Sequence, residues 1–222
     1  MSIQQNVYLK EDVKAASGDW LKSWMESEAG GRVQYHTLSS QRWRGIQNRC
    51  RPGGHVQRIR PTYIGCANGF KDFQSFANWC QEEPGHFDID SSGSHFHLDK
   101  DLLIPGNKIY SSDTCCFVPR KANLLMVFPS SRKQSDLPIG CSFHKRVRQF
   151  TAYLSGPDGA TIYLGYFRDP MLAHRAWQAA KACTIRQAAE ELPGHLLKGK
   201  QALEGIATRL EFDLLHEKES KF

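Results

Sequence analysis

The sequence predicts an α+β fold on three observations. Near the C-terminus, residues 150–154 and 161–167 are strand-like and flank a turn-rich segment, and a long helical segment follows directly. Upstream, large aromatic residues recur every three positions from Phe70 to Trp79, as along one side of a helix. Hydrophobic residues make up 40% and charged residues 23% of the 222 residues, which is ordinary for a globular protein and excludes collagen, coiled coil and full disorder.

The N-terminal part is expected to be mainly helical and aromatic. Apolar residues at helical spacing predict a helix over residues 18–25, and Gly30-Gly31 would end it. A second helix is predicted over residues 38–50, and a short strand over residues 63–66. We expect the aromatic stripe that follows to be part of the hydrophobic core.

The middle of the chain is predicted to hold short strands and one helix. Residues 85–96 are rich in Gly, Ser, Asp and His and are typical of a loop, after which a strand ends near Asp101. Another strand over residues 115–118 leads to Pro119, which is well tolerated in the first turn of a helix. That helix is predicted to end near Met126.

The C-terminal part is predicted to be a hairpin followed by two helices. The turn over residues 155–159 contains two glycines and a proline, which favours a hairpin between the flanking strands. Asp169 and Pro170 are typical of a helix start, since Asp caps free amides and Pro has the dihedral of the first turn. Pro193-Gly194 would end this helix, and an amphipathic helix follows over about residues 203–214.

Nothing in the sequence indicates a membrane or secreted protein. No apolar run approaches the roughly 18 residues that a spanning helix needs, and the first six residues lack an apolar signal core. We therefore expect a soluble, cytoplasmic protein with no membrane partner. Seven cysteines is an odd number, so they cannot all pair within the chain, and we expect reduced thiols.

Charge is distributed unevenly, although the net charge is only +6. Residues 41–75 carry seven basic residues and one acidic residue, and residues 118–150 repeat this balance. Residues 81–117, between them, carry seven acidic and two basic residues. Basic segments can neutralise phosphates, and an acidic segment can hold a divalent cation at a phosphate that is cut. Ordinary solvated charge explains the same pattern equally well.

Residues 141–182 resemble a known DNA-binding domain. A Leu-Gly-x-Phe element begins at Leu164, and the helix behind the sheet is rich in alanine. These features are similar to the DNA-binding domain of plant ethylene-response factors, which also occurs fused to phage homing endonucleases. The resemblance implies a small three-stranded antiparallel sheet packed on one helix, with its free face in the major groove of double-stranded DNA. The candidate DNA-facing residues are Lys145, Arg146, Arg148, Tyr153 and Tyr163.

A second motif combines a strand, a long turn, a strand and a helix between His95 and Asn123. It resembles the HNH endonucleases of phages, whose catalytic unit is a ββα-metal fold. The resemblance implies one divalent cation, Mg²⁺ or Mn²⁺, held by Asp99 and Asn123, with Asp101 as a further metal ligand or as the base.

The position of the family's general base falls on Lys100 rather than on a histidine. Lysine has an ordinary pKa of about 10.4 and is a poor base at neutral pH unless its surroundings lower that pKa. Lys100 could instead clamp the scissile phosphate, and His97, His95 or Asp101 could then supply the base. The family's middle asparagine is also missing, since Thr114 or Cys115 stands in its place.

The cysteines allow a structural zinc ion as a further interpretation. Cys50, Cys66 and Cys115 form the candidate ligand set. No Cys-x-x-Cys pair exists, and buried reduced cysteine is the commoner outcome. No P-loop, Rossmann glycine pattern or Gly-x-Ser-x-Gly is present, which argues against nucleotide hydrolysis and serine esterase chemistry.

These motifs predict a metal-dependent endonuclease that binds and cleaves double-stranded DNA. We expect an N-terminal region over 1–84, the ββα-metal-like unit over 85–128, the DNA-binding domain over 141–195 and a C-terminal helix over 196–222, with a boundary within 129–140. The rival interpretation, from a different class, is a phage protein that binds DNA or another partner without cutting, as a regulator or a counter-defence factor. The departures at the predicted catalytic positions favour this rival.

Overall fold

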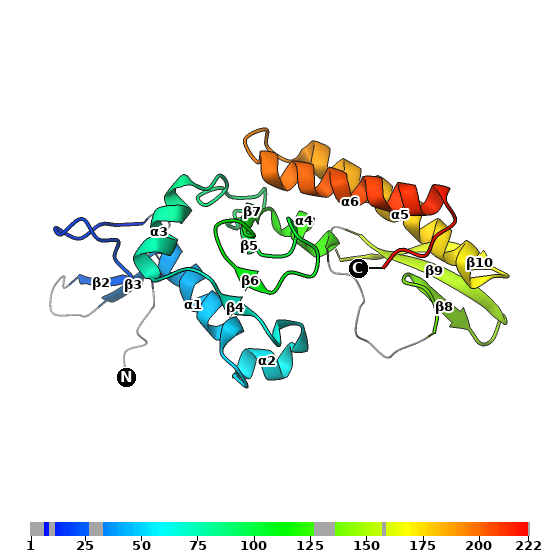
Figure 1. The fold of residues 1–222 in the computed structure, drawn as a ribbon, viewed down its shortest axis with the longest axis horizontal. Coiled ribbons are helices and arrows are strands. Elements are labelled where there is room, and N and C mark those ends of the chain that lie inside the picture. Colours follow the sequence, from blue (N-terminus) through cyan, green and yellow to red (C-terminus); the bar gives the residue numbers. More distant parts are fainter. Residues whose placement is uncertain (1–6, 9–11, 27–32, 127–135, 157–158, 222) are drawn as a thin grey trace. The chain divides into compact units, whose positions relative to one another are not determined.

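The computed structural model describes residues 7–8, 12–26, 33–126, 136–156 and 159–221 (Figure 1). The chain is a mixed α+β protein, as predicted, and separates into two compact units, Met1–Phe117 and Val118–Phe222. The predicted breaker Gly30-Gly31 and most of the predicted boundary lie outside the described residues.

The first unit begins with a small sheet of three strands. These are β1 (Val7–Tyr8), β2 (Ser23–Glu26) and β3 (Val33–His36), in the order β1-β3-β2. The helix predicted over residues 18–25 is therefore wrong. Strand β2 pairs antiparallel with β3, so that a partner later in the chain overrides the helical spacing of the apolar residues.

Two helices of the first unit carry its aromatic core. Helix α1 (Leu38–Cys50) confirms the prediction for residues 38–50, and helix α3 (Phe73–Glu82) contains most of the aromatic stripe. Phe76 is fully buried and lies against the rings of Trp43 and Trp79. The prediction that the stripe belongs to the core is confirmed.

Short elements connect and follow these helices. Helix α2 (His55–Ile59) and the 3₁₀ helix η1 (Pro61–Tyr63) precede β4 (Ala67–Asn68). The strand predicted over residues 63–66 is wrong, because the chain is still turning there and the strand begins at Ala67.

The remaining strands of this region are short. Strand β6 (Ile109–Tyr110) pairs parallel with β4, and β5 (His97–Asp99) pairs with β7 (Cys116–Val118). These strands follow the predicted order along the chain, and the helix expected after Pro119 is α4 (Arg120–Leu125), in the second unit.

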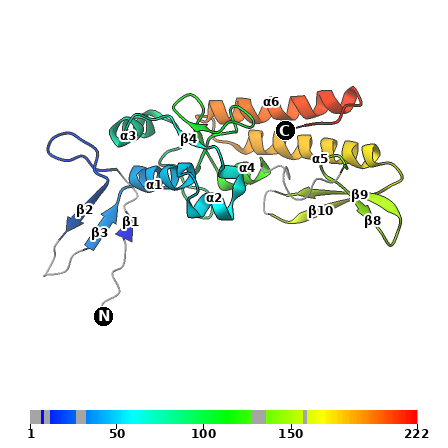
Figure 2. The same cartoon turned by 60° about the horizontal axis from the view of Figure 1, so that its bottom comes forward.

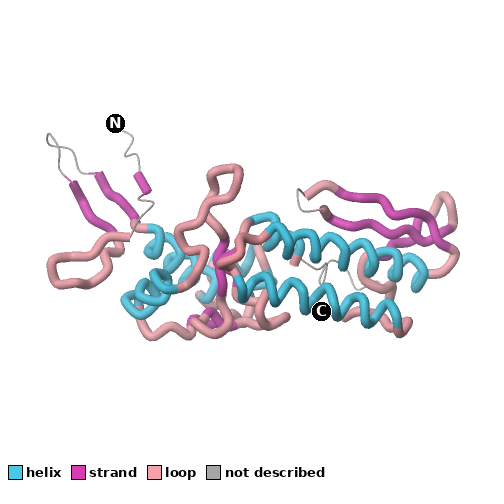
Figure 3. The backbone as a smooth tube through the Cα atoms, turned by 90° about the horizontal axis from the view of Figure 1, so that it is seen from above, coloured by secondary structure: helices cyan, strands magenta, loops and turns pink. Residues whose placement is uncertain are grey.

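The second unit contains a sheet backed by a long helical hairpin. Its strands are β8 (Cys141–His144), β9 (Gln149–Ser155) and β10 (Thr161–Phe167), antiparallel in the order β10-β9-β8. Helix α5 (Pro170–Glu191) packs on one face of this sheet, and α6 (Leu197–Leu215) packs on α5 (Figures 2 and 3). The predicted sheet on one helix and the predicted C-terminal helix are thus confirmed.

A buried polar cluster fastens the C-terminal segment to α5 and α6. His174 accepts a hydrogen bond from the backbone N–H of Ser220 (3.0 Å), and its other ring nitrogen lies 2.7 Å from the carbonyl of Ile139. Gln178 donates to the Ser220 hydroxyl, which in turn donates to Asp213. These bonds satisfy polar groups that would otherwise be buried without partners. No described helix is long and apolar enough to cross a membrane.

A close approach of backbone to side chain joins the start of β8 to α5. Gly140 has a φ of +78°, and a Cβ atom there would lie 2.1 Å from Cγ of Trp177. A glycine is needed at this position both for the left-handed backbone and for the space.

We expect Gly140→Ala to lower the free energy of unfolding by about 2–5 kcal/mol, the combined cost of a left-handed alanine and an overpacked core. Gly159→Ala is the control, because Gly159 has a φ of +84° but nothing within 4 Å of a Cβ atom. That variant should lose only about 1–2 kcal/mol. Urea unfolding followed by circular dichroism measures both, and equal losses would show that contact with Trp177 is not limiting.

Candidate functional site

The face of the three-stranded sheet turned away from α5 carries two of the five predicted DNA-facing residues, Tyr153 and Tyr163. Ala152 and Leu154 are buried on the inner face, so that Tyr153, which lies between them, points to the other side. The strand register places the following residues on this outer face: Ser142, His144, Gln149, Thr151, Tyr153, Tyr163 and Tyr166. All of them are polar or aromatic.

A β-bulge decides which tyrosines share the outer face. Tyr163 and Tyr166 are three residues apart and would point to opposite faces of a regular strand. The register shifts between Tyr163 and Gly165, which has a φ of +130°, so that Leu164 is an extra residue. The bulge brings the two tyrosines to the same face, with their ring centroids 5.4 Å apart.

The tyrosines form a continuous exposed row. Tyr153 lies directly opposite Tyr163 on the neighbouring strand, and their ring centroids are 5.6 Å apart. Tyr153, Tyr163 and Tyr166 are 38%, 48% and 45% exposed, and His144 continues the row at 5.5 Å from Tyr166. Exposed aromatic rings in mutual contact leave a continuous apolar area in water, and such patches commonly mark interaction sites.

The turn between β8 and β9 adds positive charge beside the outer face. Lys145, Arg146 and Arg148 all lie in this turn and are exposed. Arg148 has a φ of 56°, and its backbone N–H donates to the carbonyl of His144 (2.8 Å), which closes the turn. All five residues predicted to face DNA therefore lie on the outer face or in the adjoining turn.

The sequence reasoning missed Tyr166 and His144 on this face. Both depend on register, and Tyr166 depends on the bulge. Gly165 inside a strand pattern was a signal for such a bulge.

In the first unit, the predicted metal ligand Asp99 lies at the end of β5 and is buried. Its Oδ1 accepts hydrogen bonds from the backbone N–H groups of Asp101 (2.9 Å) and Leu102 (2.6 Å), which hold the chain in a tight turn. Burial raises the pKa of Asp99 to about 6, and the neighbouring Asp101 carboxylate adds to this shift.

Lys100 is also buried, and its ammonium group has defined partners. Its Nζ donates to Oδ2 of Asp101 (2.9 Å) and to the carbonyl of Asn107 (2.9 Å). The Asn107 side chain donates back to the carbonyl of Lys100 (2.6 Å) and to that of Ile109 (2.7 Å). Lys100 thus fastens the loop between β5 and β6, while Asp101 remains about half exposed.

The other predicted residues of this site are distributed over both units. His97 and Asp99 alternate with Leu98 along β5 and so share one face of that strand. Asn123 lies on α4, in the second unit. Its pairing with Asp99 stays a prediction.

The chemistry of the carboxylates suits a divalent cation. Mg²⁺ takes oxygen ligands and retains several waters, so that one or two carboxylates are sufficient. Asp99 and Asp101 repel each other, and a bound cation would relieve that repulsion. Among the described residues, no three His, Cys, Asp or Glu side chains are grouped as metal ligands.

The cysteines of the candidate zinc set are free thiols. Burial raises the pKa of Cys50 to about 11 and that of Cys115 to about 12, which opposes the thiolate form that zinc binds. Cys66 is buried as well. Since the described part of the chain has no group of three metal-ligating side chains, this set supports no proposal.

A buried polar network in the first unit was not predicted. Oδ2 of Asp12 accepts hydrogen bonds from Nε2 of His86 (2.8 Å) and from Gln81 (2.6 Å), and Oδ1 accepts from the backbone N–H of Ser39 (2.8 Å). Arg42 donates to the other ring nitrogen of His86, Nδ1, and to the backbone carbonyl of His86. Asp12 is far from its partners in the sequence, so no local pattern could reveal the network.

This network is not a catalytic triad, although it contains Ser, His and Asp. Asp12 accepts from the same ring nitrogen that faces Ser39, whereas a triad carboxylate accepts from the opposite one. Ser39 and His86 are also both buried. The network therefore ties the N-terminal segment to α1 and α3.

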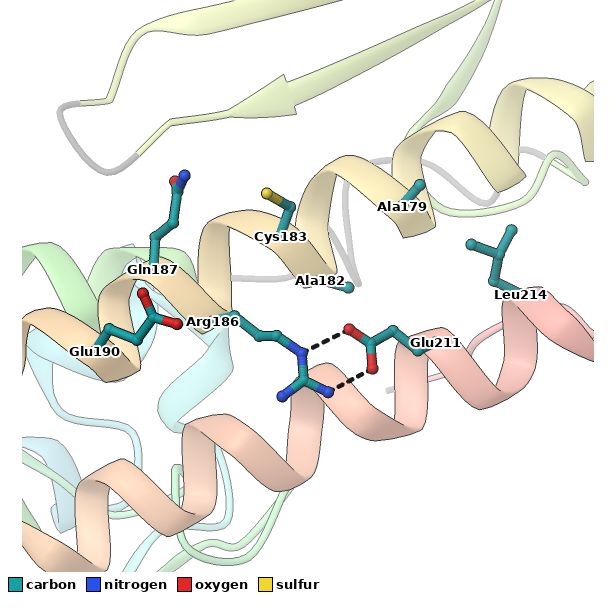
Figure 4. Close-up of a pocket in the computed structure, with 8 residues that line it drawn as sticks. All are labelled: Ala179, Ala182, Cys183, Arg186, Gln187, Glu190, Glu211 and Leu214. Carbon is teal, nitrogen blue, oxygen red and sulfur yellow. Dashed lines mark hydrogen bonds and ion pairs between the residues drawn. The ribbon is translucent and has the colours of Figure 1, made fainter.

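An open hollow of about 450 Å³ lies between α5 and α6 (Figure 4). The Arg186 guanidinium donates twice to the Glu211 carboxylate across it, with Nε to Oε1 at 2.6 Å. Cys183 is exposed in this hollow, but no histidine lines it. We assign no chemistry to it.

No protein-family model, curated protein or solved structure matches this chain. The resemblances to ethylene-response factors and HNH endonucleases therefore depend on the quoted residues alone.

The buried network predicts a pH dependence of stability. Burial lowers the pKa of His86, and Arg42 adds to this, although the hydrogen bond to Asp12 opposes it. The unfolded chain then takes up a proton near pH 6.5 that the folded chain does not, so stability is full above that pH and falls as pH drops below it. One such proton changes stability by at most about 1.4 kcal/mol per pH unit.

Thermal unfolding between pH 8 and pH 5 should show this loss, and His86→Gln should flatten it. His55→Gln is the control, because His55 is exposed on α2. An unchanged profile in the His86 variant would mean that other groups cause the acid sensitivity.

Proposed function

We propose that this protein binds double-stranded DNA through the outer face of β8, β9 and β10. One observation carries the proposal: three exposed tyrosines in mutual contact lie beside a turn with three exposed basic residues. The major groove of DNA admits a sheet face or a two-stranded ribbon. Basic side chains at the rim would contact phosphates, and the polar and aromatic side chains between them would contact base edges.

The arrangement of the second unit supports this use of the sheet. Helix α5 covers the inner face, so the outer face is the one available to a partner. Small residues of the helix, among them Ala173, are fully buried and allow close packing. A sheet held against a long helix presents its side chains at fixed positions, as base readout requires.

We expect Tyr163→Ala to weaken binding to a duplex about tenfold, or roughly 1.4 kcal/mol. The salt dependence should not change, because tyrosine carries no charge that displaces counterions. Ile162→Ala is the matched control, since Ile162 is the neighbouring, similarly exposed residue on the opposite face. Fluorescence anisotropy with a labelled duplex measures both variants. Equal affinities would remove the outer face from the interface.

A second candidate function is metal-dependent cleavage of the bound DNA. The observation that favours it is the buried carboxylate of Asp99 beside Asp101, because a raised pKa there means that the charged form is kept at a cost in stability. Asp99 and Asp101 would hold an Mg²⁺ or Mn²⁺ ion, which when bound would stabilise charge on phosphate and leaving oxygens. His97 and Asp101 are then the residues to accept a proton from water.

The position of Lys100 favours the rival, a DNA-binding protein that does not cut. Its ammonium group is hydrogen-bonded to Asp101 and Asn107, and therefore lacks the freedom expected of either a base or a phosphate clamp. The same partners explain why a lysine can be buried here.

Cleavage is tested by nicking of supercoiled plasmid with Mg²⁺, Mn²⁺ or chelator. We expect Asp99→Asn to lose at least about 100-fold in rate while DNA binding survives, since a metal contact is worth several kcal/mol. Asparagine keeps the oxygen that accepts from the turn amides, so the fold should hold. Asp113→Asn, at an exposed site in the same acidic segment, is the control. Absence of nicking by the wild type would favour the protein that does not cut, and nicking that persists in chelator would contradict the metal site.

A further inference from the structure

Three exposed arginines lie close together in the chain where α1 gives way to α2 and η1. Arg51 caps the C-terminal end of α1, Arg58 lies in the last turn of α2, and Arg60 follows it. All three side chains are exposed. We name residues 51–64, which contain them, the arginine corner.

A buried glutamine holds the arginine corner in shape. Gln57 donates to the carbonyls of Arg49 (3.0 Å) and Tyr63 (3.1 Å), and accepts from the backbone N–H of Gly53 (3.2 Å). One side chain thus ties the end of α1 to η1 across the bend. The guanidinium of Arg49 lies 5.7 Å from the centre of the Tyr63 ring and adds a cation–π contact at the base of the corner.

The positive charge of the corner is not neutralised nearby in the sequence. No acidic residue occurs from residue 29 to residue 71. None of the three arginines forms an ion pair with any residue that the structure describes. A rigid backbone that presents several free guanidinium groups loses little entropy when an anion binds.

We propose that the arginine corner binds the phosphate backbone of duplex DNA, as a second contact in addition to the sheet of the other unit. Guanidinium groups match phosphate oxygens with paired hydrogen bonds, which makes arginine the preferred residue for such contacts. This inference depends on the proposed binding of double-stranded DNA. It assigns to the corner a positioning contact without base readout.

Two exposed isoleucines in the same segment suggest the principal alternative partner. Ile59 and Ile64 are each 60% exposed, and basic residues next to apolar ones also suit an anionic membrane surface. Helix α2 has only five residues, however, so that it offers too little apolar area for stable insertion. Charge complementarity therefore favours nucleic acid.

The test measures the affinity of the full chain for a mixed-sequence duplex over a series of KCl concentrations. We expect Arg58→Ala with Arg60→Ala to reduce the slope of log affinity against log salt by about 1.8, or 0.9 for each lost phosphate contact. Arg58→Lys with Arg60→Lys should keep most of the slope. Lys218→Ala with Lys221→Ala, at two exposed positions near the C-terminus, is the control because it removes the same charge.

The outcomes separate the inference from the proposed function. Failure of the wild type to bind duplex DNA overturns both, whereas binding with an unchanged slope in the Arg58/Arg60 variant overturns the inference alone. A second double variant, Arg146→Ala with Arg148→Gly, tests the basic turn. If the slope is reduced in the Arg58/Arg60 variant and unchanged in this one, the corner contacts phosphates and the basic turn does not. If the Arg58/Arg60 variant loses binding to phosphatidylserine vesicles while its slope with duplex DNA is unchanged, the corner is a lipid contact and the inference is wrong.

Discussion

The packing of α5 against the inner face of the sheet is the interaction on which the second unit depends. Trp177 of α5 fits against Gly140, where no larger residue has room, and so fixes the distance between the helix and the start of β8. Lys181 of the same helix donates to the last turn of α4, and Gln178 holds the C-terminal segment. One helix thus supports the sheet, α4 and the C-terminus. The side chains of the outer face are therefore held in position by the contacts that α5 makes with the inner face.

The first unit combines its aromatic core with a buried network of charged and polar groups. Arg42 is partly buried, and it donates to the carbonyls of His86 and Phe96 and lies over the ring of Phe117. Asp12 is charged at the other end of the network, where hydrogen bonds from His86 and Ser39 outweigh burial and lower its pKa. A buried charge is tolerated only when it is paired and hydrogen-bonded. Removal of one partner is therefore expected to cost more than the bond itself is worth.

The sequence predicted elements well where the signals were local. The strand over residues 161–167 was predicted from the turn residues before it, and the start of the next helix was predicted because Asp169 can cap that helix. The error at residues 18–25 arose because strand β2 exists only through its pairing with β3. At the candidate sites, chemistry was predictable and geometry was not. Asp99 and Tyr153 could be chosen by residue type, but the place of Tyr166 depends on a one-residue bulge. The burial of Lys100 depends on its hydrogen bond to Asn107, seven residues further along the chain.

The burial of Lys100 also limits how a nuclease built on this chain would work. To reach a phosphate, the ammonium would have to leave the Asn107 carbonyl and the Asp101 carboxylate, and each hydrogen bond of a charged group contributes roughly 1.5–3 kcal/mol. To act as a base it would have to lose its proton while it remains next to Asp101. Both routes are opposed by contacts that hold the loop together. Asp101, which is about half exposed, and His97 are the other candidates to accept a proton from water, since carboxylates and imidazoles are common general bases. Lys100 is then best understood as the residue that positions Asp101, and any activity depends on what that carboxylate and Asp99 do together.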